Sequence, residues 1–79
     1  MSLIRVVVAL HGELRARFPD RAQEEAITLP AGASVGEALA RLGHEREAWL
    51  TSVNGCVVNR SRTLAQGDRL DVYPFIEGG

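Results

Sequence analysis

The hydrophobic positions near the start of the chain follow two patterns that predict strands. Residues 3–10 form a run rich in Val, Ile and Leu with little polar alternation, which is typical of a strand covered on both faces. Residues 26–29 alternate weakly before a proline and a glycine, which predicts a second strand. We expect the two strands to pair as a hairpin with a wide connection. Within that connection, residues 13–20 are expected to form a short irregular helix or a loop.

The next pattern has a helical period. The segment SVGEALARLG begins with Ser34 and carries Glu37 three positions later, which is the signature of a capping box, and it closes on Gly43, a typical helix stop. Three apolar side chains are expected to share one face of this helix: Val35, Leu39 and Leu42.

The second half of the chain returns to strand patterns. Asn54-Gly55 lies between two apolar runs, which predicts a type I′ hairpin joining strands at about residues 50–53 and 56–58. The segment RLDVYPF predicts a last strand, in which alternate side chains face opposite ways. Leu70 and Val72 are expected to point inward, and the outward residues are then Arg69, Asp71 and Tyr73.

This order of elements predicts one α+β domain over residues 1–79, with a mixed sheet of four to five strands packed on one main helix. A single helix covers only one face of a sheet, so the other face meets water or a partner. If the first and last strands are neighbours, the handedness of the crossover makes the fold a ubiquitin-like β-grasp.

Composition narrows the classes of function. The net charge is −1, which disfavours nucleic acid and anionic membranes as partners. The apolar run at the start is too short, and carries Arg5 too far inside it, for a signal peptide or a membrane span, so a cytoplasmic protein is expected. All nine basic residues are arginine, a bias expected from a GC-rich genome, so the chain offers no lysine for an isopeptide bond.

Five other polar or reactive side chains have ordinary interpretations. Cys56 has no neighbouring feature that would lower its thiol pKa, so we expect a small apolar residue. His11 and His44 lie at a strand end and after a helix stop, where polar caps are common, and their spacing suggests no metal site. Arg60 and Arg62 are expected in a solvated loop.

The combination of four motifs resembles the MoaD/ThiS-type sulfur carriers, a ubiquitin-like β-grasp family. The motifs are VGEALARLG after the second strand, VNG in the hairpin, GDRLDVYP entering the last strand, and GG at the end of the sequence. The resemblance implies that a ubiquitin-activating-type enzyme adenylates the carboxylate of Gly79, which then becomes a thiocarboxylate. It implies that the carrier binds no cofactor itself and that the enzyme supplies ATP and metal. Gly78 would keep the approach to the enzyme narrow.

Such a tail needs a docking surface on the domain, because ordering it costs free energy. We expect this surface beside the tail, formed by Tyr73, Phe75, Ile76 and Glu77, with residues 76–79 as a flexible functional tail. The alternative is that Tyr73 or Phe75 completes the core. The partners would be the adenylating enzyme and a sulfur-acceptor enzyme or synthase subunit.

Two other functions stay open. The segment VNGCVVN…LAQGDRLDVYPF also resembles the ubiquitin-like domains attached to Mut7-C-type RNase modules, which would make the chain a non-catalytic interaction module. It is also compatible with a protein modifier conjugated through Gly79. Within the sulfur carriers, the YPFIEGG ending favours molybdopterin over thiamin biosynthesis.

Overall fold

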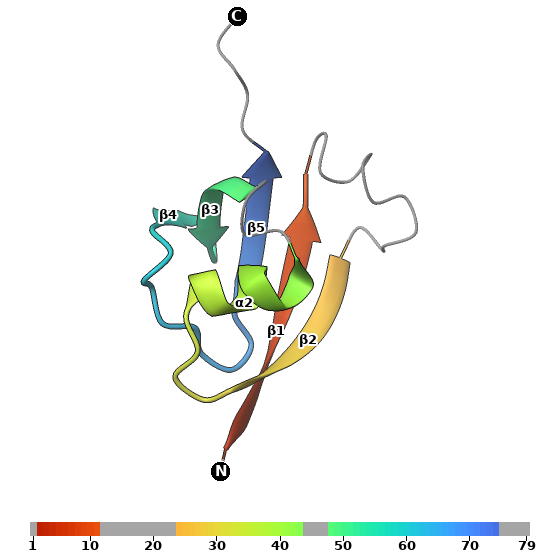
Figure 1. Ribbon diagram of the computed structural model, residues 1–79, viewed down its shortest axis with the longest axis vertical. Helices are drawn as coiled ribbons and strands as arrows, with labels where there is room; N and C mark the ends of the chain where they lie inside the picture. The colour runs from red at the N-terminus through yellow and green to blue at the C-terminus, as the bar shows by residue number, and fades with distance from the viewer. Residues whose placement is uncertain (1, 12–23, 44–47, 75–79) are drawn as a thin grey trace, which may run out of the picture.

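The computed structural model describes residues 2–11, 24–43 and 48–74 of the chain. Five strands and one helix follow one another in these ranges: β1 Leu3–Leu10, β2 Glu24–Pro30, α2 Val35–Leu42, β3 Ala48–Val53, β4 Cys56–Val58 and β5 Arg69–Pro74 (Figure 1). The strands expected at residues 26–29 and 50–53 each begin two residues earlier than the pattern suggested. The segment 13–20, expected as an irregular helix or a loop, and His44 lie outside the described residues.

The five strands form one mixed sheet in the order β2-β1-β5-β3-β4. Strand β1 pairs antiparallel with β2, as the predicted hairpin requires, and parallel with β5. Strand β3 pairs antiparallel with both β5 and β4. The first strand is therefore interior, and the expected adjacency of the first and last strands is confirmed.

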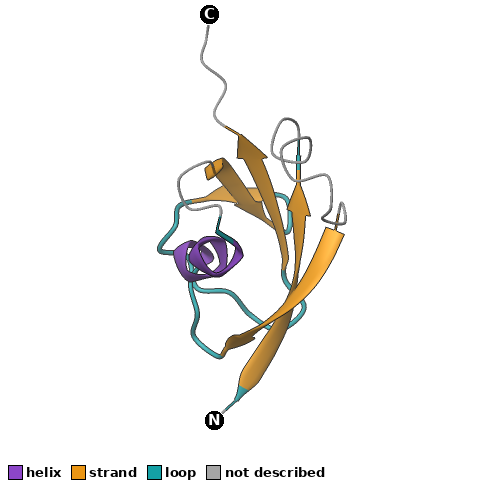
Figure 2. Ribbon diagram, turned by 45° about the vertical axis from the view of Figure 1, so that its right-hand side comes forward, coloured by secondary structure: helices purple, strands orange, loops and turns teal. Residues whose placement is uncertain are grey.

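Helix α2 packs against one face of the sheet, as Figure 2 shows, and its caps follow the sequence prediction. The Oγ of Ser34 accepts a hydrogen bond from the backbone N–H of Glu37 at 3.2 Å. Gly43 ends the helix in the left-handed conformation, with φ 79°, and its N–H bonds to the Ala40 carbonyl. The predicted inner face is confirmed, because Val35, Leu39 and Leu42 are all buried.

The core lies between α2 and the inner face of the sheet. Its largest fully buried side chains come from four strands and the helix: Leu29, Leu39, Leu70, Val6, Val8, Val35, Val53 and Val72. Leu70 and Val72 point inward from β5, as alternation predicted. Because β5 is the middle strand, it connects the core to both halves of the sheet.

The β3–β4 hairpin turns at Asn54-Gly55, with φ values of 52° and 87° that fit the predicted type I′ turn. The Asn54 side chain also ties this turn to the start of β5. Its Nδ2 donates to Asp68 Oδ1 and its Oδ1 accepts from the Arg69 backbone N–H, both at 2.9 Å. The hairpin therefore holds β5 in register from its first residue.

Candidate functional site

Figure 2 shows that α2 covers one face of the sheet, and the opposite face is called the open face here. By the alternation of strands, the outward side chains of the middle strands lie on the open face. Tyr73 lies on this face and is 36% exposed, which excludes the alternative that it completes the core. Its cross-strand neighbour on β3 is Leu50, which is 40% exposed. Directly paired residues of an antiparallel sheet lie on the same face with Cβ atoms about 5 Å apart, so the two side chains form one apolar surface.

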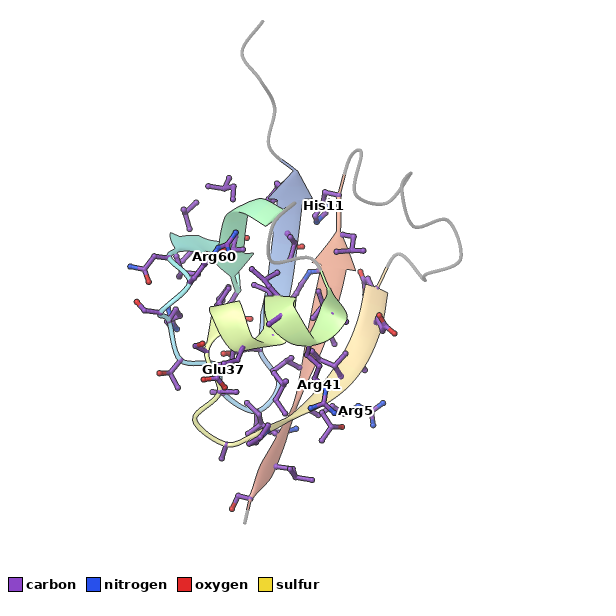
Figure 3. All side chains as sticks on the ribbon, viewed as in Figure 1. Arg5, His11, Glu37, Arg41 and Arg60 are labelled. Carbon is purple, nitrogen blue, oxygen red and sulfur yellow. The ribbon has the colours of Figure 1, made fainter. Side chains whose placement is uncertain are left out.

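The ring of Tyr73 stacks on the imidazole of His11, the residue that follows β1. The ring centroids are 4.5 Å apart and the planes are 13° from parallel. His11 Nε2 lies 2.9 Å from Oδ1 of Asp71, on β5 two residues before Tyr73. An ionised carboxylate only accepts hydrogen bonds, so Nε2 is the protonated nitrogen that donates. Figure 3 labels His11 at this end of β1, beside β5.

Asp71 is largely shielded from water, with a side chain only 13% exposed, although it belongs to the outward positions of β5. Its neighbours on the open face provide the cover. Besides His11, Oδ1 accepts a hydrogen bond from Arg69 Nε at 3.3 Å. A carboxylate in this position needs such partners, because an unpaired buried charge would be strongly destabilising.

Arg69 extends the polar network across the sheet to β2. Its Nη1 donates to Glu24 Oε2 at 2.8 Å, and β1 lies between the two strands that carry them. The hydrogen bond to Glu24 and then the charge of Asp71 raise the pKa of Arg69 above its usual value, so the guanidinium stays charged at any physiological pH. Ala9, an outward residue of β1 paired with both Glu24 and Asp71, is fully buried, and its small side chain leaves room for this crossing.

The open face thus has two parts around one stacked pair of rings. An apolar part extends from Tyr73 to Leu50 on β3 and to Val57 on β4, which is 68% exposed. A polar part, in which Asp71 and Glu24 each have a hydrogen-bonded partner, extends from His11 through Asp71 and Arg69 to Glu24 on β2. Exposed apolar side chains beside paired charges are typical of a surface for a protein partner.

The expected tail begins where β5 ends. Strand β5 ends at Pro74, and Tyr73, the residue before it, is 36% exposed. The other predicted site residues, Phe75, Ile76, Glu77, Gly78 and Gly79, lie outside the described residues. The structure therefore places Tyr73 of the predicted docking residues and adds His11, Asp71 and Leu50 to its surroundings.

The N-terminus of helix α2 offers no binding site for an anion. The first amides of α2 already have partners: Val35 N–H donates to the Arg62 carbonyl and Gly36 N–H to the Arg60 carbonyl, each at 2.9 Å. Arg60 and Arg62 are exposed in the loop between β4 and β5, as expected. This loop caps the helix through its backbone and leaves no amide of the first turn for a phosphate.

Cys56 differs from the expectation of a packed apolar residue. It is exposed, because β4 is an edge strand of the sheet. Within the described ranges, no group of three or more His, Cys, Asp or Glu side chains is arranged to hold a metal ion. No helix in the same part of the chain is both long and apolar enough to cross a bilayer.

The mixed sheet with parallel first and last strands, one covering helix and an open face defines a ubiquitin-like β-grasp protein. The fold class expected from the sequence is confirmed. The profile of the ThiS family matches residues 8–79, and the chain belongs to that family. No curated protein matches the chain by sequence.

Solved structures of the same fold cover nearly the whole chain. A putative molybdopterin converting factor subunit 1 from Pyrococcus furiosus superposes with a TM-score of 0.76 at 24% identity, over 92% of this chain and 99% of that one. SAMP1 from Haloferax volcanii gives 0.77 at 21% identity, over 95% and 99%. A chain of the complex of subunits 1 and 2 of the molybdopterin-converting factor from Helicobacter pylori gives 0.60 at 20% identity, over 96% and 100%. At these identities the likeness establishes the fold.

Sequence reasoning identified Tyr73 but missed His11 as its neighbour. Position 11 follows β1 and position 73 lies near the end of β5, so only the parallel pairing of β1 with β5 brings them together. One signal was available. The expected adjacency of the first and last strands places the residues at their carboxyl ends at the same edge of the sheet.

Proposed function

We propose that this protein is a sulfur carrier whose reactive group is the carboxylate of Gly79. The observation that carries the proposal is the match to the ThiS family, which extends through Gly78 to Gly79 itself. Residues 1–79 form one β-grasp domain, which partner enzymes recognise. Residues 76–79 are its functional tail. The protein is a co-substrate of enzymes and has no catalytic site of its own.

The chemistry of the tail follows from the weakness of a carboxylate as an electrophile. A carboxylate oxygen of Gly79 attacks the α-phosphate of ATP, pyrophosphate leaves, and the acyl carbon is now bonded to a good leaving group, AMP. A sulfur nucleophile then displaces AMP to give the thiocarboxylate. The ubiquitin-activating-type enzyme supplies ATP and metal for this reaction. Glycine at the last two positions lets the tail pass a narrow channel, because no Cβ intervenes.

Docking of the domain provides the free energy that orders the tail. Fixing a residue costs about 1–2 kcal/mol, so a tail of several residues needs a substantial contact elsewhere. Tyr73, with its exposed ring, is the described residue that we assign to this contact. Phe75, Ile76 and Glu77, which lie outside the described residues, are the other residues that we propose for this contact.

The sulfur acceptor proposed here is a synthase subunit of molybdopterin biosynthesis, with thiamin biosynthesis as the second possibility. Two of the structural neighbours are named as subunits of molybdopterin converting factors, and one of them is in complex with subunit 2. This chain would be the small subunit of such a synthase, in the cytoplasm. Neither nucleic acid nor a membrane is a proposed partner.

A second candidate function is that of a protein modifier. It is favoured by the structural similarity to SAMP1, which is named as a small archaeal modifier protein. Activation at Gly79 would be identical, and an amine would replace sulfur as the nucleophile. The chain contains no lysine, so a chain of copies linked by isopeptide bonds to lysine side chains is excluded.

One experiment separates these functions. The protein is incubated with the adenylating enzyme of its own organism, ATP, magnesium and a sulfur donor, and its intact mass is measured. A sulfur carrier gains the mass of sulfur in exchange for oxygen at Gly79, and the variant lacking Gly79 does not. Absence of any acyl-adenylate would favour the interaction module, and covalent attachment to other proteins in cells would favour the modifier.

A further inference from the structure

We infer that His11 is a positioning residue of the docking surface: it holds the ring of Tyr73 for contact with the adenylating enzyme, and Asp71 in turn holds His11. The inference rests on the proposed function, because it concerns the first partner of that function. It adds a residue that belongs to no predicted motif and lies far from Tyr73 in the chain, at the end of the first strand.

The length of the tail determines which partner must touch this surface. From Tyr73 to Gly79 there are six residue steps, which reach at most about 20 Å when fully extended. An enzyme that holds the carboxylate of Gly79 therefore lies within that distance of Tyr73. Activation precedes transfer both for a sulfur carrier and for a modifier, so the adenylating enzyme is the occupant common to both functions.

The stack prepares Tyr73 for this contact. With ring planes 13° from parallel and centroids 4.5 Å apart, the imidazole covers one face of the phenol ring and restricts its rotamers. Tyr73 as a whole is still 36% exposed, and its paired neighbour Leu50 extends the exposed surface onto β3. A side chain that is already ordered loses less entropy on binding, so the stack increases affinity without touching the enzyme.

Asp71 fixes the imidazole that makes the stack. The hydrogen bond from His11 Nε2 to Oδ1 of Asp71 measures 2.9 Å, and the Asp71 side chain is only 13% exposed. Arg69 holds the same oxygen through Nε, and it is itself held by Glu24. The ring of His11 therefore has both a fixed position and a fixed tilt.

Two substitutions at position 11 distinguish stacking from hydrogen bonding. His11→Phe keeps a ring beside Tyr73 and loses the bond to Asp71. His11→Gln keeps a donor for Asp71 and loses the stacked ring. If the stacked ring is what orders Tyr73 for docking, His11→Gln raises KM for the carrier in ATP-pyrophosphate exchange by about threefold to tenfold with kcat unchanged. The variant His11→Phe, which keeps a stacked ring, then has a KM close to that of the wild type.

The double variant tests whether His11 acts through Tyr73. Tyr73→Ala alone raises KM, and adding His11→Gln to it has no further effect when the two residues act as one unit. Leu3→Ser is the control, since Leu3 is 64% exposed at the start of β1, the end of that strand away from His11, and is expected to leave KM unchanged. The melting temperature of each variant is measured in parallel, because a loss of fold would raise KM for every substitution alike.

The results of these exchange assays distinguish a failure of this inference from a failure of the proposed function. Wild-type protein that supports no exchange would overturn the proposed function and the inference together. Normal exchange with an unchanged KM in His11→Gln, or additive effects of His11→Gln and Tyr73→Ala, would overturn the inference alone. Concentration-dependent dimers that dissociate in Tyr73→Ala would assign the surface to a second copy of the chain and would also overturn it.

Discussion

The imidazole of His11 stacks on the ring of Tyr73, and the same imidazole donates a hydrogen bond to Asp71 two residues earlier on β5. This relationship crosses from the end of β1 to the end of β5, the two parallel strands in the middle of the sheet. It gives the open face an ordered aromatic group close to where the chain leaves the sheet. The stability of the domain and its docking are therefore expected to depend on different residues.

The variant Tyr73→Ser tests directly whether docking and stability depend on different residues. The ring is partly exposed and lies outside the core, so its loss is expected to change the melting temperature little. Adenylation of the carrier is expected to fall at least tenfold at subsaturating protein, because the docking contact is lost. Pyrophosphate exchange and thermal unfolding measure the two effects. A large loss of stability with unchanged KM would assign Tyr73 to the fold instead.

Two isosteric substitutions test the charges of the open face. Asp71→Asn removes a largely buried negative charge beside His11 and Arg69, and we expect unfolding to become easier by about 1 kcal/mol. Glu24→Gln removes the charge of a half-exposed pair, and no measurable change is expected because solvent screens that pair. Urea unfolding of both variants gives the comparison. Equal effects at the two positions would show that burial of Asp71 has no energetic consequence.

Ser34→Ala tests the predicted start of α2. The variant loses the oxygen that accepts the Glu37 N–H, and the cost of a lost N-cap is about 1 kcal/mol. For a domain of this size that corresponds to a fall in melting temperature of about 4–8 °C. Ser2→Ala is the matched control, because Ser2 is exposed before β1 and caps no helix. If both substitutions have the same effect, the cap does not stabilise the helix.

Gly43→Ala and Gly36→Ala are expected to have opposite signs. Gly43 ends α2 with φ +79°, a conformation that costs alanine about 1 kcal/mol. Gly36 is helical, and a Cβ there would approach the Arg60 carbonyl oxygen to 3.4 Å, which is still van der Waals contact. Alanine at position 36 is therefore expected to stabilise the domain slightly through its higher helix propensity. Destabilisation at position 36 would mean that the loop after β4 cannot move by a few tenths of an ångström.

Leu39→Ala tests the contact between the helix and the sheet. Leu39 is fully buried, and truncating such a side chain costs about 2–5 kcal/mol, which is a large part of the stability of a small domain. Leu3→Ala, at a residue that is 64% exposed, is expected to change stability by less than about 0.5 kcal/mol. Circular dichroism during urea titration measures both. Similar midpoints for the two variants would contradict the proposed core.

The sequence by itself determined the local elements of this protein. Ser34 and Gly43 define where the helix begins and ends, and Asn54-Gly55 defines the hairpin, because caps and tight turns depend on residues only a few positions apart. Alternation along the last strand placed Leu70 inside and Tyr73 outside, since the side-chain period of a strand is local as well.

Only the tertiary structure decided how the open face is organised. The shielding of Asp71, the reach of Arg69 across β1 to Glu24 and the stack of His11 on Tyr73 join three strands that are distant in sequence. Strand register fixes these contacts, and register depends on the packing of the whole sheet against α2. The exposure of Cys56 has the same origin, because the position of β4 at the edge is a property of strand order.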